Sequence, residues 1–352
     1  MKRVFLFITI TVTMSVMLVL FVFFYSQTSR GGGMIRYFPS HIVGIKSIQS
    51  IGKDCYYLAG VAGDSVFIGD FHNPKTLYLY HHSVLDSIIL PISPTQRITK
   101  ASTLTVEFPT IYLHDILWGN VLTGQIHQAS FTQYHLASSL MFQSVPLSYQ
   151  NYLLLDFDTL TKTNRLEKVL IQEGQRSIHS QFPLDKQVDG YFCTQGALAV
   201  DTDRGEVYFV YQYRNELLRL DTSLYLLQRS HTIDTVRQID FTVDTVFEGE
   251  IARTTFSSPP QLVNSKLRTY GSYLFISSGI QADNQSIDNF EKAMTIDVYR
   301  KTDLKYQFSF YLTDLFGQRI RDFLIEGDRI IGLAGTDLIV YELDLSQVSY
   351  PE

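Results

Sequence analysis

The chain has 352 residues, of which 45% are hydrophobic, 13% aromatic and 18% charged. This composition supplies a large apolar core and excludes an intrinsically disordered body. The formal net charge is −6 and lysine and arginine form no cluster, which excludes nucleic acid as a partner because phosphate binding requires concentrated positive charge.

The first predicted element is an apolar segment, Val4–Tyr25, interrupted only by hydroxyl side chains. A helix of this length extends about 33 Å, which is enough to cross the hydrocarbon core of a bilayer. We therefore expect residues 1–30 to be an uncleaved signal anchor that forms one transmembrane helix, with a cleaved signal peptide as the alternative. The flanking charges, Lys2 and Arg3 before the segment and Arg30 and Arg36 after it, scarcely decide its orientation. Because a large body with no second span follows, we expect that body to be extracytoplasmic, in the periplasm or at the cell surface.

Residues 31–352 contain short runs rich in Tyr, Phe, Val and Ile that are closed by turn residues, the pattern of β-strands. The clearest unit, Gly196–Ser223, reads as strand, Asp/Gly turn, strand, polar turn and strand. Repetition of such units about every 40–50 residues indicates the blades of a β-propeller. Six units can be drawn, with first strands near Tyr56, Leu104, Ser139, Gly196, Tyr273 and Ile320.

The sixth unit has only three strands before the chain ends at Glu352. Circular propellers can complete such a unit with a strand from the other end of the chain, which leaves no open sheet edge. We therefore expect the N-terminal segment to close the ring, through either Met34–Pro39 or Ile42–Ile48. The triglycine Gly31–Gly33 would then serve as a flexible tether.

The pattern GALAVD–TDRG–EVYFVY–QYRN–ELLRLD, with its weaker echoes in the first and last units, resembles the six-bladed β-propellers of the TolB-like and NHL/gluconolactonase-like groups. The resemblance covers about Met34–Leu343 and implies an all-β, six-bladed propeller preceded by one transmembrane helix. A seven-bladed ring and a pair of β-sandwiches are the alternative folds. Fold carries over better than function in such a comparison, because one fold hosts many unrelated activities.

Two stretches, Asp240–Pro260 and Ile280–Ala293, are long for connections between strands, and long loops in compact folds are often functional or disordered. Within the second, Ser286–Lys292 is expected to form a helical turn. Cys55 and Cys193 lie far apart in strand-like contexts, so we expect free thiols rather than a disulfide.

Polar and aromatic residues recur where the second strand of a unit connects to the third, and such connections share one face of a propeller. They favour a binding rim, although turn chemistry alone also favours Asn at these positions. His114 and Asp115 are adjacent on a predicted strand and point to opposite faces, so a solvated strand end is the expected interpretation of this pair. The candidate rim consists of His72, Asn73, His114, Trp118, Tyr213, Arg214 and Asn215.

Paired carboxylates of Glu248 and Glu250 are candidate ligands for a hard cation such as Ca²⁺. The resemblance to metal-dependent lactonases implies an ion in the central channel, but a full ligand set cannot be matched here. Asp156 and Asp158 share one face of a predicted strand, where a polar turn is the simpler interpretation. Asp201–Gly205 is too short for a Ca²⁺ loop and is expected to be a hairpin turn.

No nucleophile elbow, zinc-protease motif, phosphate loop or dinucleotide fingerprint occurs in the chain. We therefore expect a binding protein rather than an enzyme: a membrane-tethered module for a protein or small-molecule ligand, with no cofactor. The alternative is a metal-dependent hydrolase or lyase of the lactonase type, with Ca²⁺ as its cofactor.

Overall fold

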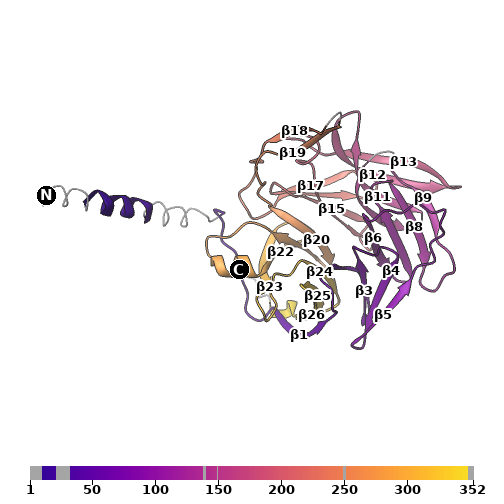
Figure 1. Cartoon of the computed structure of the whole chain (residues 1–352), viewed down its shortest axis with the longest axis horizontal. Coiled ribbons are helices and arrows are strands. Elements are labelled where there is room, and N and C mark those ends of the chain that lie inside the picture. The colour runs from indigo at the N-terminus through magenta and orange to yellow at the C-terminus, as the bar shows by residue number, and fades with distance from the viewer. Residues whose placement is uncertain (1–9, 21–31, 138–139, 149, 249–250, 348–352) are drawn as a thin grey trace.

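The chain forms an all-β propeller of six blades, each an antiparallel sheet of four strands (Figure 1). The computed structural model describes residues 10–20, 32–137, 140–148, 150–248 and 251–347. In five blades the four strands follow one another along the chain, and the first strand is the innermost. The predicted six-bladed ring is confirmed, and the seven-bladed and sandwich alternatives are wrong.

Blade 1 consists of β2 (Tyr56–Ala62), β3 (Ser65–Asp70), β4 (Thr76–His81) and β5 (Val84–Ile89). Blade 2 consists of β6 (Ser102–Glu107), β7 (Thr110–Asp115), β8 (Asn120–Gln125) and β9 (Thr132–His135). Blade 3 consists of β10 (Met141–Ser148), β11 (Asn151–Asp158), β12 (Thr163–Gln172) and β13 (Gln175–Pro183).

Blade 4 consists of β14 (Gly196–Asp201), β15 (Glu206–Tyr211), β16 (Glu216–Asp221) and β17 (Leu226–His231). Blade 5 consists of β20 (Asn264–Tyr270), β21 (Tyr273–Ser278), β22 (Met294–Arg300) and β23 (Tyr306–Leu312). Blade 6 consists of β24 (Asp322–Glu326), β25 (Arg329–Ala334), β26 (Asp337–Leu343) and β1 (Val43–Ser50).

Strand β1 completes blade 6, so the two ends of the propeller are joined in one sheet. It pairs antiparallel with β26, from Val43 opposite Leu343 to Ser50 opposite Asp337. Figure 1 shows β1 next to β26, at the outer edge of blade 6. The predicted closure is confirmed for the Ile42–Ile48 candidate. Met34–Pro39 instead runs along blade 5, where the Tyr37 carbonyl accepts a 2.8 Å hydrogen bond from the Ser309 amide.

Six apolar core clusters fill the spaces between neighbouring blades. Within β3, Phe67 packs in the cluster between blades 1 and 2, whereas the next residue, Ile68, packs in the cluster between blades 1 and 6. Adjacent side chains of a strand point to opposite faces. Both faces of a blade are therefore buried, which is why the central strands read as continuous apolar runs rather than as an alternating pattern.

Buried tyrosines fasten backbone segments to one another. The hydroxyl oxygens of Tyr57, Tyr211 and Tyr299 accept hydrogen bonds from the amides of Leu104, Asp185 and Ile233, at 2.6, 3.1 and 2.8 Å. Burial raises the pKa of Tyr57 to about 12, so its phenol stays neutral. A tyrosine ring fills apolar space while its hydroxyl satisfies a backbone group, which accounts for part of the tyrosine content of this chain.

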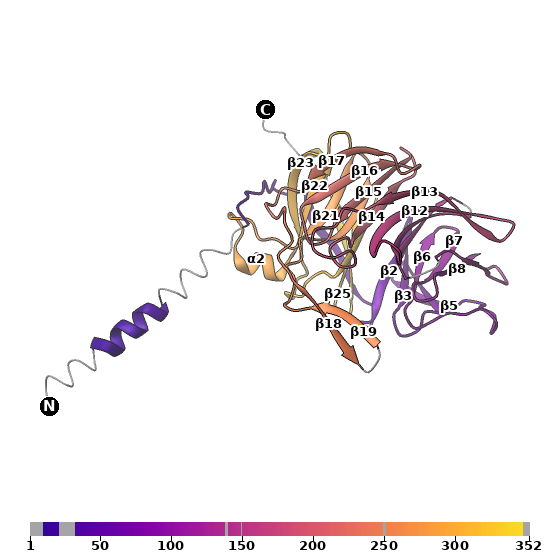
Figure 2. The ribbon, with the colours of Figure 1, turned by 90° about the horizontal axis from the view of Figure 1, so that it is seen from above.

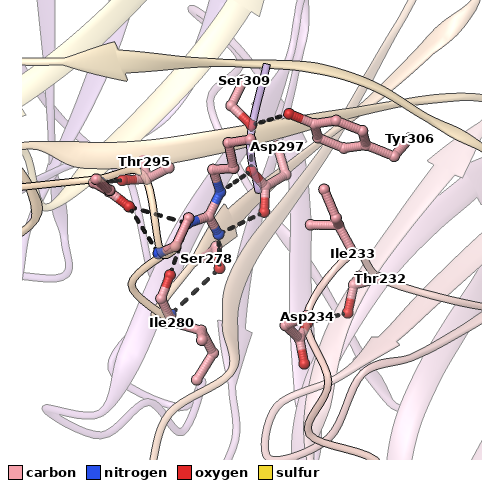
Figure 3. Close-up of polar contacts among 12 residues, drawn as sticks. Thr232, Ile233, Asp234, Ser278, Ile280, Thr295, Asp297, Tyr306 and Ser309 are labelled. Atoms are coloured by element: carbon pink, nitrogen blue, oxygen red, sulfur yellow. Dashed lines mark hydrogen bonds and ion pairs between the residues drawn. The ribbon is translucent and has the colours of Figure 1, made fainter. Parts of the chain in front are cut away.

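Segment 32–42 is fastened to blade 5 by a buried arginine. The Arg36 guanidinium donates hydrogen bonds to the Asp297 carboxylate, the Ser278 hydroxyl, the Ile280 carbonyl and the Gln285 side-chain oxygen. Figure 3 shows the network around Asp297, which Tyr306 and Ser309 extend. Arg36 is 2% exposed, so it belongs to the propeller rather than to a membrane-flanking charge set.

The ring has two faces, because the connections of an antiparallel sheet alternate between its ends. The hairpin face carries the connections between first and second strands, such as 63–64 and 108–109. The loop face carries the connections between second and third strands, at 71–75, 116–119, 212–215 and 279–293. Helix α2 (Ile287–Lys292) lies in the last of these connections, and Ser286 caps it by accepting a hydrogen bond from the Asn289 amide. The predicted helical turn is thus confirmed.

The long stretch 240–260 forms neither a disordered loop nor a fifth strand of a blade. It contains the two-stranded hairpin of β18 (Val243–Glu248) and β19 (Ile251–Phe256), which projects from the propeller in Figure 2. Phe241 and Phe256 pack with Tyr213 at the base of this hairpin. Cys55 and Cys193 are both free thiols, as expected.

Residues 10–20 are helical and stand apart from the propeller in both views (Figures 1 and 2). Their apolar side chains are exposed, among them Met14, Met17 and Val19. Among the residues that the structure describes, no helix has both the length and the apolar character needed to cross a membrane. The remaining residues of the predicted anchor, 1–9 and 21–30, lie outside the described part of the chain.

Candidate functional site

A cavity of about 490 Å³ lies where the six innermost strands converge, and we name it the central cavity. All six inner strands contribute to its wall, and most of the contributing side chains are aliphatic, aromatic or hydroxyl-bearing. Apolar wall residues include Leu58, Phe142, Val145, Leu267 and Ile325. Large pockets with apolar walls and a few polar groups are the usual sites for small ligands in proteins.

Two long polar side chains in the wall, Gln143 and Arg268, already make hydrogen bonds to other groups of the protein. The Gln143 amide makes two hydrogen bonds to the backbone of Leu198, at 3.2 and 3.3 Å, and so joins β10 to β14. The Arg268 guanidinium donates to the Phe323 carbonyl at 2.9 Å and to the Asp322 carboxylate at 3.0 Å, joining β20 to β24. Both side chains serve ring closure and leave little hydrogen-bonding capacity for a ligand.

The Glu107 carboxyl group is different, because it has no hydrogen-bond or ion-pair partner within the described part of the chain. Glu107 is the last residue of β6, lies in the wall of the central cavity toward the hairpin face, and has an exposed side chain. The surrounding protein displaces water from the carboxylate and raises the pKa of Glu107 to about 7. An acid with such a pKa is poised between its neutral and charged forms under physiological conditions.

His114 also lies in the wall, between blades 2 and 3. Its Nδ1 is hydrogen-bonded to the Ser144 hydroxyl of β10, and its Nε2 is buried without a partner among the described residues. Burial lowers the pKa of His114 to about 4, so the imidazole is neutral at pH 7. His114 thus bridges β7 and β10, and a ligand would reach its free nitrogen only if neighbouring side chains moved.

His114 and Asp115 point to opposite faces of β7, as expected, but the predicted solvated strand end is wrong, since both side chains are buried. Asp115 accepts hydrogen bonds from the Ser102 hydroxyl and from the amides of Leu117 and Trp118, at 2.8 to 3.1 Å. The carboxylate therefore shapes the connection that carries Trp118. Its role is structural, because these bonds satisfy backbone donors that lie outside the ladder.

The loop face holds three exposed members of the predicted rim. His72 and Asn73 lie in the β3–β4 connection and Trp118 lies in the β7–β8 connection. Trp118 is 52% exposed, and the Arg97 guanidinium carbon lies 5.6 Å from the centre of its indole ring. The side chains of His72 and Trp118 are therefore accessible to a partner, whereas the Asn73 amide already donates a 2.8 Å hydrogen bond to the Thr76 hydroxyl.

The blade 4 members of the rim lie in the equivalent β15–β16 connection, but their side chains are buried. Arg214 is 1% exposed, pairs with Glu216 at 2.7 Å and stacks on Tyr211. Asn215 bonds the Asp234 carbonyl, and Tyr213 packs against Phe241. The expectation that Arg214 faces a partner is therefore wrong, because its guanidinium is buried and paired with Glu216.

The acidic residues considered in the sequence analysis lie at separate places in the structure. Asp156 and Asp158 do share one face of β11, where Arg165 lies 4.0 Å from the first and 2.8 Å from the second. Asp156 is fully buried, and desolvation together with the neighbouring Glu167 raises its pKa to about 6.

The candidate metal ligands are not described by the structure: Glu248 ends β18 with a side chain outside the described set, and Glu250 lies outside the described residues altogether. Asp201–Gly205 is the β14–β15 hairpin turn, as predicted.

Glu107 and Ser144 were absent from the sequence-based candidates. The segment STLTVE alternates polar and apolar residues, and this alternation places Thr103, Thr105 and Glu107 on one face of an innermost strand. The innermost strands of a propeller turn one face toward the axis. The alternation in this segment therefore predicts that Glu107 faces the axis, provided that β6 is known to be an innermost strand. Ser144 could not be predicted in this way, because its segment MFQSVPLS has no regular alternation of polar and apolar residues.

Comparison with models of protein families gives no match, and no curated protein matches the chain in sequence. Many solved structures resemble it in fold, and two propellers are examples. One is a catalytically inactive histidine variant of virginiamycin B lyase from Staphylococcus aureus with quinupristin, at 9% identity and a TM-score of 0.50, covering 86% of this chain and 100% of that chain. The other is a DUF4221 family member from Bacteroides vulgatus, at 8% identity and a TM-score of 0.52, covering 86% of this chain and 97% of that chain. At these identities the likeness shows the six-bladed fold alone.

Proposed function

We propose that this protein is a membrane-tethered, extracytoplasmic propeller that binds a small ligand in its central cavity. The observation that carries the proposal is Glu107, a carboxyl group without a protein partner among the described residues, in a cavity whose walls combine apolar and polar groups. An acid with a raised pKa and no protein partner, set in the wall of a cavity, is typical of binding and catalytic sites. The resemblance to TolB-like and NHL propellers agrees with a binding role.

The wall chemistry defines a class of ligand. Leu58, Phe142 and Val145 offer an apolar surface, and the hydroxyls of Thr103 and Thr105 offer a few hydrogen bonds. Glu107 supplies the one acidic group, which pairs with an amine or another strong donor. The expected ligand therefore has an apolar body and a cationic or hydrogen-bond-donating head.

The experiment uses a fluorescent dansyl-alkylamine and its N-acetylated form, which lacks the charge. The purified full chain should bind the amine more tightly than the acetylated probe. Glu107→Gln should weaken amine binding about tenfold, the value expected for loss of one charge-assisted contact of about 1.4 kcal/mol. Glu173→Gln, in the β12–β13 turn far from the cavity, is the matched control. Equal binding of both probes, or equal affinity in Glu107→Gln and the parent, would reject the cavity as the site.

Tethering rests on the apolar segment Val4–Tyr25, whose described part is a helix with exposed apolar side chains. Burial of Arg36 in the propeller removes one positive charge from the body side of this segment. Lys2 and Arg3 then outweigh Arg30, and the positive-inside rule favours an extracytoplasmic body. Proteolysis of intact cells or spheroplasts tests the orientation: protection of the body in intact spheroplasts would contradict it.

A lyase or hydrolase of the lactonase type is the second candidate, favoured by His114 in the cavity wall and by the fold shared with a lyase. The buried Nε2 of His114 argues for the binding role, because a base must reach its substrate. Turnover of a lactone panel with and without Ca²⁺, compared with His114→Asn, separates the two candidates. Metal-stimulated turnover that requires His114 would promote the enzyme.

A further inference from the structure

A cluster of three metal-ligating side chains lies on the loop face of blade 1, away from the central cavity. Cys55 immediately precedes β2, Asp70 ends β3, and His72 stands in the β3–β4 connection. One ligand atom from each residue lies within 4.8 Å of the other two. Together they offer one sulfur, one oxygen and one nitrogen, which no other group of residues in the described ranges brings together.

The backbone forms this cluster for local reasons. The Asp70 carboxylate accepts a 2.8 Å hydrogen bond from the His72 amide, which bends the chain after β3 and brings the two side chains to one edge. The Phe71 amide donates to the Cys55 carbonyl at 3.1 Å, which holds the start of β2 against the same turn. Asp70 is 2% exposed, Cys55 is half-buried and His72 is exposed. The surrounding protein therefore holds Asp70 and Cys55 in place, whereas the His72 side chain can change its rotamer.

We propose that Cys55, Asp70 and His72 bind Zn²⁺. Zinc prefers this combination of thiolate, carboxylate and imidazole ligands, and three protein ligands with a free fourth position are the usual arrangement of an open zinc site. The site would therefore hold a water molecule or a ligand group in addition to the protein atoms.

The distances fit this ion. Zinc–sulfur and zinc–oxygen bonds of the usual lengths, set at a tetrahedral angle, place sulfur and oxygen about 3.6 Å apart. The observed separation between the Cys55 Sγ and the Asp70 Oδ1 is 3.4 Å. A ring nitrogen of His72 lies within 4.8 Å of both atoms, and an exposed side chain changes its rotamer at low cost to complete three ligands.

Charge and protons also balance. The Cys55 thiol donates its hydrogen to the Asp70 carboxylate. Zinc replaces that hydrogen, so one proton leaves to solvent and the thiolate, the carboxylate and the dication together are neutral. The Lys53 ammonium lies 3.5 Å from the Asp70 carboxylate, but its side chain is 52% exposed and can turn away.

The test is titration of the purified full chain with Co²⁺ and Zn²⁺. One equivalent of Co²⁺ should produce a thiolate-to-cobalt charge-transfer band and tetrahedral d–d bands, and one equivalent of Zn²⁺ should abolish them. Cys55→Ser should remove the charge-transfer band. His72→Ala should lower the metal affinity by about tenfold or more.

Two variants of the same chain serve as controls. Cys193→Ser changes the other, buried thiol, and His231→Ala changes an exposed histidine on the outer strand of blade 4. Both should bind metal as the parent does, and circular dichroism verifies that all four variants are folded. A folded parent with no charge-transfer band, or a band that survives in Cys55→Ser, would overturn the proposal.

Discussion

The Arg36 guanidinium and the Asp297 carboxylate form two parallel hydrogen bonds of 2.7 and 2.9 Å, although the two residues are 261 positions apart. Both side chains are almost completely buried. The pair fixes the segment that leads from the N-terminal region to the closing strand β1. The propeller therefore gains one strong contact at the place where its ends meet.

Removal of Arg36 should destabilise the protein strongly. Arg36→Gln leaves the Asp297 carboxylate buried without its counter-ion, and loss of one partner of a buried pair costs about 3 to 5 kcal/mol. Urea unfolding followed by circular dichroism measures the loss in the full chain. Lys292→Ala removes a solvent-exposed ion pair with Asp288 on helix α2 and should leave the unfolding midpoint unchanged. Equal effects of the two substitutions would contradict the structural role of Arg36.

Ring closure predicts an asymmetry within one strand. Ile48 packs against the core between blades 5 and 6, whereas Ile45 on the same strand is exposed. Ile48→Asp should destabilise the protein by about 2 kcal/mol, because a charged group replaces an apolar one at the edge of the core. Ile45→Asp should change the unfolding free energy by less than about 0.5 kcal/mol. If both variants unfold like the parent, β1 does not close the ring in solution.

His114 should make the protein sensitive to acid. Its pKa falls from 6.5 to about 4 on burial, so between these values the folded protein binds fewer protons than the unfolded chain. The contribution of His114 to the free energy of unfolding should therefore fall by about 3 kcal/mol as the pH is lowered from 6.5 to 4. His114→Asn keeps an acceptor for Ser144, does not titrate and should remove this contribution, which is measured as the difference between the pH profiles of the parent and the variant. His127→Asn, at an exposed turn, should retain the slope of the parent.

Glu107 should change the free energy of unfolding in the opposite direction to His114, over a similar pH range. Its pKa rises from 4.5 to about 7, so the folded protein binds more protons than the unfolded chain between these values. Its contribution to stability is present below pH 4.5 and is lost as the pH rises through 7. Glu107→Gln in the His114→Asn background isolates this effect, and the variant should be more stable than its parent at pH 8 but not at pH 4.5. An identical difference at both values would show that Glu107 is fully solvated.

The central strands and the ring were predictable because they depend on local patterns. A strand buried on both faces, such as β15, reads as an unbroken apolar run, and turns such as Asp201–Gly205 carry their own signature. Outer strands such as β13 (Gln175–Pro183) were missed, since their sequence is as polar as a loop. The inner strand β20 (Asn264–Tyr270) was missed because one face lines the cavity rather than a core.

Sequence alone determined the number of blades, the terminal closure and the absence of a disulfide, because periodicity, strand count and cysteine spacing are properties of the chain itself. Only the tertiary structure decided which polar residues are available. Arg214 lies in a connection between strands and Glu107 ends a strand, yet Arg214 is paired with Glu216 and stacked on Tyr211, whereas Glu107 lies without a partner among the described residues in the wall of a cavity. Arg214 also donates to the carbonyls of Cys193 and Asp185, and the inner strands of all six blades surround the cavity that holds Glu107. Burial and pairing therefore depend on groups that are distant in the sequence, which no local pattern encodes.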